Sequence, residues 1–83
     1  MPTVISQDGF RVRVLGPPRE HPPPHVHVEY GPDGLTIIRL ATAQSPAEVW
    51  CVYNMRDRDV VRAYHLVEQH HDLILAAWRK IHG

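Results

Sequence analysis

HVHVEYGPDGLTIIRL, residues 25–40, is the stretch from which the fold of this chain can be worked out. Successive side chains of a β-strand point to opposite faces, so a strand over 25–30 separates the apolar residues from the polar ones: Val26, Val28 and Tyr30 against His25, His27 and Glu29. Residues 31–34, GPDG, favour turn geometry, and an apolar run follows over 35–40. The stretch therefore predicts an antiparallel hairpin.

One further strand is expected before this hairpin and one after it. Residues 10–14, FRVRV, alternate in the same way, and residues 49–53, VWCVY, are rich in the branched and aromatic residues that strands favour, with Asn54 closing the strand. Between 16 and 24 the chain is rich in proline, which removes backbone donors and prevents a helix from starting. Residues 41–47 are read as a connection. The sequence thus predicts three to four strands.

The C-terminal part has the period of a helix. From Asp57 onward one apolar stripe recurs at spacings of three, four or seven: Val60, Tyr64, Val67, Ile74, Trp78 and Ile81. An unbroken helix over 58–82 would be about 37 Å long, more than a small sheet of short strands covers. We therefore expect a break near residues 70–72, with Asp72 as the N-cap of the last segment.

These elements predict an α+β fold. A small antiparallel sheet of three to four strands would carry one kinked or two C-terminal helices on one face, leaving the other face open. Residues 1–83 are expected to form a single domain, with a strand-rich part over 1–54 and a helical part over 57–82. A domain of this size buries a modest core, so a homo-oligomer or a partner is a natural source of further stability.

Composition argues against several classes of function. Nine basic and nine acidic residues give no net charge, whereas a protein that grips nucleic acid phosphates usually has a basic excess. No run approaches the ~18 apolar residues of a membrane span, and the N-terminus lacks the pattern of a secretion signal. A single cysteine, Cys51, allows no internal disulfide and fits a cytoplasmic protein.

Seven histidines are the unusual feature, and three of them are candidate metal ligands. His25 and His27 would share one face of a strand, and the prolines would bring His21 back beside them. Three imidazoles with an open fourth position are the pattern of a catalytic zinc site, although other divalent metals also bind imidazole. Glu29 lies some ~13 Å along the strand from His25 and would serve as a general base if the protein is an enzyme. Alternatively, these polar residues simply cover a solvated sheet face.

The open sheet face is also a candidate binding face. Its expected residues are Arg11, Arg13, Glu29 and Tyr30. Nucleic acid could be held there by arginines that include Arg19, with Tyr30 or Trp50 as a stacking surface. Three arginines are few for a nucleic-acid-binding surface, and a solvated sheet face explains them as well.

Three segments together suggest a known family: DGFRVRV at 8–14, EHPPPHVHVEYG at 20–31 and HHDLILAAWRKI at 70–81. They resemble the small bacterial proteins grouped as domain of unknown function 4160. The matching positions are His21, Pro23, Pro24, His25, His27, Tyr30, Gly31, His70, Asp72 and Trp78. Segment 33–56 departs from the family by being longer and less acidic. The resemblance implies no established activity. It implies a gene pair of toxin–antitoxin type, and hence a small protein partner from the adjacent gene.

Two function hypotheses follow. The first is a cytoplasmic protein-binding module, not an enzyme, that meets its partner through a histidine-rich open face or through its helices. The second is a metal-dependent hydrolase or nuclease in which His21, His25 and His27 hold the ion and Glu29 is the base.

Overall fold

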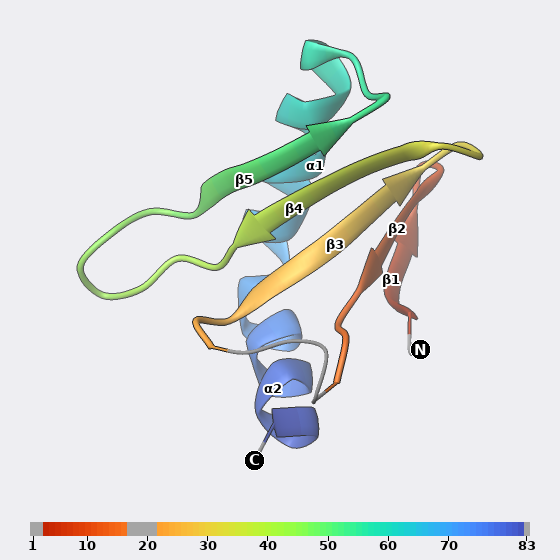
Figure 1. Cartoon of the computed structure of the whole chain (residues 1–83). Helices are drawn as coiled ribbons and strands as arrows, with labels where there is room; N and C mark the ends of the chain where they lie inside the picture. The colour runs from red at the N-terminus through yellow and green to blue at the C-terminus, as the bar shows by residue number, and fades with distance from the viewer. Residues whose placement is uncertain (1–2, 17–21, 83) are drawn as a thin grey trace.

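The protein is built on a five-stranded antiparallel sheet. The computed structural model describes residues 3–16 and 22–82. The strands follow one another across the sheet in chain order, each pairing with the next: β1 Thr3–Gln7, β2 Phe10–Arg13, β3 His25–Tyr30, β4 Gly34–Arg39 and β5 Glu48–Tyr53. Helices α1 (Asp57–Gln69) and α2 (His71–His82) lie behind the sheet in the view of Figure 1. The α+β class is therefore confirmed, but the expected three to four strands are too few.

The strand that the sequence analysis missed is β1. It is joined to β2 by the two-residue turn Asp8-Gly9, because Gln7 pairs directly with Phe10. Both turn residues have positive φ, 53° and 84°. Two consecutive positive φ angles belong to a type I′ turn, whose favoured sequences include Asp-Gly. This dipeptide was the local signal for an additional strand before residue 10.

The core lies between the sheet and the helices. Val26 and Val28 are fully buried, as the alternation of residues 25–30 predicts. Their neighbours across the sheet are also apolar: Val28 pairs with Val12, and Val26 with Ile38. The helices cover this face with their own buried side chains, Ala63, Leu66, Val67, Ile74 and Trp78. Burial of apolar side chains stabilises the fold by ~1.5–3 kcal/mol for each large residue, so this layer holds sheet and helices together.

The helical part is broken at residue 70, within the range 70–72 that the comparison of helix length with sheet size predicts. α1 ends at Gln69, His70 is its C-cap, and α2 begins at His71. Asp72 lies inside the first turn of α2, so the prediction that it is the N-cap is wrong. Backbone hydrogen bonds continue through the break, since the His70 amide donates to Leu66 and its carbonyl accepts from Ile74. Neither helix in the described part of the chain is long and apolar enough to cross a membrane.

Candidate functional site

One face of the sheet is not covered by the helices, and the strand register defines its residues. Directly paired residues of neighbouring strands point to the same side, so the pairing gives rows across the sheet. Two rows cross all five strands: Ser6, Arg11, Glu29, Leu35 and Tyr53, and Thr3, Arg13, His27, Ile37 and Cys51. A shorter third row on the same side is His25, Arg39 and Glu48. We call the two longer rows the open face. It is turned toward the viewer in Figure 1.

The half of the open face on β2 and β3 is charged. Arg11 and Arg13 both contact one carboxylate, with their Nε atoms 3.3 and 3.4 Å from Glu29 Oε1. Arg11 also donates a hydrogen bond of 2.8 Å to the carbonyl oxygen of Gly31. The Nε of Arg13 is buried and makes no hydrogen bond, so its contact with Glu29 is an ion pair only. Two guanidinium groups therefore hold Glu29 in place.

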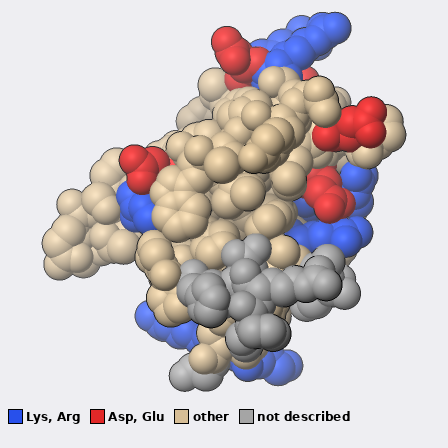
Figure 2. Space-filling model, in the orientation of Figure 1, with Lys and Arg blue, Asp and Glu red and all other residues tan. Residues whose placement is uncertain are grey.

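In these two rows, the half on β4 and β5 is apolar, and the ion pair of Arg39 with Glu48 lies beyond it in the third row. Leu35, Ile37 and Cys51 are half-buried there, and the Tyr53 side chain is 54% exposed. In Figure 2, which has the same orientation, a broad surface without charged side chains occupies the middle of the face. The sequence signal for this apolar half was residues 35–40, because a strand that is apolar at both odd and even positions is typical of one that is covered on both faces.

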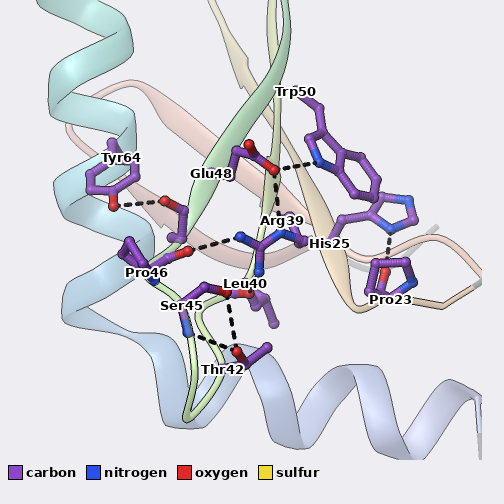
Figure 3. Close-up of polar contacts among 11 residues, drawn as sticks. Pro23, His25, Arg39, Leu40, Thr42, Ser45, Pro46, Glu48, Trp50 and Tyr64 are labelled. Atoms are coloured by element: carbon purple, nitrogen blue, oxygen red, sulfur yellow. Dashed lines mark hydrogen bonds and ion pairs between the residues drawn. The ribbon is translucent and has the colours of Figure 1, made fainter.

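His25 was expected on the solvated face, and this expectation is wrong. Its side chain is only 6% exposed. The imidazole lies between two indoles, with ring centres 5.0 Å from Trp50 and 5.2 Å from Trp78 (Figure 3 shows it beside Trp50). His25 Nδ1 lies 2.8 Å from the carbonyl oxygen of Pro23, and since a carbonyl only accepts, Nδ1 must carry the proton. His25 thus joins the proline segment to β5 and α2.

Trp50 covers His25 because β5 is irregular at this point. Ile37 pairs with Cys51 and Ile38 with Val49, so Trp50 is an extra residue in the ladder. An extra residue bends the strand and redirects its side chain. The indole is held by Glu48, whose Oε1 accepts from Trp50 Nε1 at 3.2 Å and from Arg39 Nε at 3.5 Å (Figure 3).

Two of the three candidate metal ligands lie in the described part of the chain. His21 lies outside the described residues. His25 and His27 have ring centres 6.1 Å apart, and His27 lies on the open face. Across residues 3–16 and 22–82 there is no group of three histidine, cysteine or acidic residues placed to hold an ion. The metal site therefore stays a prediction.

The four residues of the predicted binding face are not all together. Arg11, Arg13 and Glu29 lie side by side, whereas Tyr30 points to the other side of the sheet and stacks on Phe10 with ring centres 4.4 Å apart. Arg19 lies outside the described residues.

Tyr30 instead lies beside a cation from α1. The Arg62 guanidinium lies 5.0 Å from the centre of the Phe10 ring and 5.9 Å from that of Tyr30. Side-chain hydrogen bonds with Tyr30 and Asp59 raise the pKa of Arg62, and the one with Tyr30 has the larger effect. Tyr30 therefore belongs to the contact between α1 and the sheet.

Comparison with protein families agrees with the family resemblance of the three sequence segments. The family model described as "Domain of unknown function (DUF4160)" matches residues 9–79, from the turn before β2 to the last turns of α2. The chain belongs to this family. The DUF4160 match includes the charged and apolar halves of the open face and both indoles around His25. No curated protein and no solved structure matches the chain.

Proposed function

We propose that this DUF4160 protein is a cytoplasmic protein-binding module whose open face binds a small partner protein encoded by the adjacent gene, in the manner of a toxin–antitoxin pair. The observation that carries the proposal is that β4 places Leu35 and Ile37 on a face that the helices leave uncovered. Protein interfaces combine an apolar, aromatic centre with a polar rim, and arginine is enriched in them relative to the rest of the surface. The apolar half, with Tyr53, and the paired arginines beside it have this composition.

Coexpression with the adjacent gene tests the proposal. We expect the two proteins to copurify, and we expect Ile37→Lys to weaken the complex by ~30-fold or more, as loss of a central contact does. Leu73→Lys is the matched control, because Leu73 is an apolar residue of α2, 54% exposed, away from the open face. Thermal unfolding must show that both variants remain folded. Two proteins that elute separately, or equal binding by both variants, would contradict the proposal.

A metal site at His25 and His27, completed by His21, is the second candidate. The observation in its favour is the Nδ1 contact of His25 with the Pro23 carbonyl, because metal-binding histidines usually donate their second ring N–H to such a group. A bound zinc would supply an activated water for hydrolysis, and Glu29 is the nearby carboxylate that would act as base.

Titration calorimetry with zinc, nickel and manganese tests the metal site. We expect stoichiometric binding that is lost in His27→Ala and kept in His65→Ala, since the His65 side chain is 71% exposed on α1. No binding heat with any of the three ions at neutral pH would end this candidate.

A further inference from the structure

A cavity of about 380 Å³ lies between α2 and the loop that joins β4 to β5. Helix α2 contributes His71, Leu75 and Arg79 to its lining, and residues 40–43 together with Pro24 form the other wall. The volume is within the ~300–1,000 Å³ of sites that bind small molecules. No residue of the open face lines this cavity, so it is separate from the proposed partner-binding surface.

The three side chains from α2 follow one face of the helix. Residues 71, 75 and 79 are each four apart, and side chains at this spacing are neighbours on a helix surface. At 1.5 Å per residue the first and the last are ~12 Å apart along the axis. Leu75 and His71 are half-buried, whereas Arg79 is exposed. The helical wall is therefore apolar in the middle and polar at both ends.

The opposite wall is apolar and is held by hydrogen bonds. Leu40 is only 2% exposed, and its amide donates to the Pro24 carbonyl at 2.9 Å. The next turn is fixed by Thr42, whose amide donates to the Ser45 carbonyl at 2.8 Å and whose hydroxyl accepts from the Ser45 amide at 3.1 Å (Figure 3 shows Thr42 bonded to Ser45). A wall that is already in place lowers the entropic cost of binding a ligand.

The charge of the cavity selects the class of ligand. Within the described part of the chain, no acidic side chain lines the cavity and no carboxylate pairs with Arg79. A guanidinium binds a carboxylate through two parallel hydrogen bonds, because the two planar groups match in shape. The rest of the lining is mainly apolar. The cavity is therefore complementary to an anion whose body is apolar.

We propose that this cavity binds a small carboxylate with a linear apolar chain, such as a medium-chain fatty acid. The carboxylate pairs with Arg79, and the chain lies between Leu75 and Leu40 and ends at the His71 ring. A chain of about eight carbons, with its carboxylate hydrogen-bonded to Arg79, matches the ~12 Å between the two polar ends. A hydrated dianion such as inorganic phosphate leaves the apolar walls unused and therefore binds more weakly.

An NMR titration of the isotope-labelled chain with octanoate tests the proposal. We expect saturable binding with a Kd below about 1 mM, and shift changes concentrated in residues 40–43 and 71–79. Octanol and octylamine keep the chain but lose the negative charge, and they should bind at least ~5-fold more weakly. No saturable binding of octanoate, shift changes centred elsewhere, or equal binding of octanol would overturn the proposal.

Three variants test the assignment of the site. Arg79→Gln should weaken octanoate binding at least ~5-fold. Lys80→Gln is the matched control, because Lys80 has the same charge, is exposed on the same helix and does not line the cavity. Ala43→Leu should block binding by filling the cavity, and since Ala43 is exposed the fold should be kept. Equal effects of Arg79→Gln and Lys80→Gln, or unchanged binding in Ala43→Leu, would overturn the proposal.

The test is independent of the proposed function. Ile37→Lys changes the open face, and Ile37 does not line the cavity, so this variant should bind octanoate like the natural chain. Loss of octanoate binding in Ile37→Lys, with the fold retained in thermal unfolding, would overturn the assignment to this cavity.

Discussion

Replacement of His25 by alanine tests whether this histidine of the PPPHVH motif holds the fold together. The change removes the hydrogen bond to the Pro23 carbonyl at 2.8 Å and the ring contacts with Trp50 and Trp78, among other contacts of this side chain. A hydrogen bond contributes ~0.5–1.5 kcal/mol and an aromatic pair another ~0.5–1.5 kcal/mol each. The expected loss in the free energy of unfolding is therefore about 3 kcal/mol, within a range of roughly 1.5–4.5 kcal/mol.

Thermal and urea unfolding measure this loss. In a domain of this size 1 kcal/mol shifts Tm by ~4–8 °C, so His25→Ala should lower Tm by roughly 12–24 °C. His25→Phe keeps a ring between the indoles but loses the hydrogen bond, and should cost about 1 kcal/mol. His27→Ala is the control on the same strand. It is half-buried on the open face and should change stability by ~0.5 kcal/mol.

The outcome discriminates between two roles of the motif. The measurements belong in buffer with a chelator, so that no bound metal contributes to stability. A loss below ~1 kcal/mol for His25→Ala, or a loss no larger than that of His27→Ala, would refute the reasoning. The contacts with Trp50 and Trp78 would then contribute little, and the motif would need an explanation in binding alone.

Three other substitutions test the fold by chemical or thermal unfolding. Gly34→Ala should destabilise by ~1–3 kcal/mol, because its new methyl group would overlap the Tyr30 carbonyl oxygen; unchanged stability would contradict this close approach. Ile38→Ala should cost ~2–5 kcal/mol, since Ile38 is fully buried, and a cost under ~1 kcal/mol would mean that the core collapses around the gap. Tyr64→Phe should cost ~0.5–1.5 kcal/mol through loss of its 2.8 Å hydrogen bond to the Ala47 carbonyl, and an equal midpoint in urea would show that this bond adds nothing.

Most elements were predictable because their signals are local. The alternation over 25–30 coincides with β3, and the 3.6-residue period over 57–82 coincides with α1 and α2. The break at His70 followed from comparing helix length with sheet size. β1 was missed although Asp8-Gly9 signals a hairpin, because its five residues, TVISQ, carry little apolar alternation of their own. Their strand conformation depends on pairing with β2.

The candidate site was predicted less completely. Alternation over residues 10–14 and 25–30 predicts Arg11, Arg13 and Glu29 on one face, and in the register they are neighbours. The apolar half of the face was not predicted, since alternation was applied to β3 but not to β4. His27 is on the open face as expected, whereas His25 is buried.

The periods of two and 3.6 residues therefore establish the elements, the class of fold and which side chains of β3 face the core, since each depends on residues close together in the chain. Alternation cannot show what covers a side chain from elsewhere. His25 is enclosed because an extra residue in β5 turns Trp50 over it and because α2 brings Trp78 beside it. The position of β1 and β5 at the two edges of the sheet likewise follows from strand order, which depends on pairing between distant segments. Burial of His25 and exposure of β5 are thus properties of the assembled sheet.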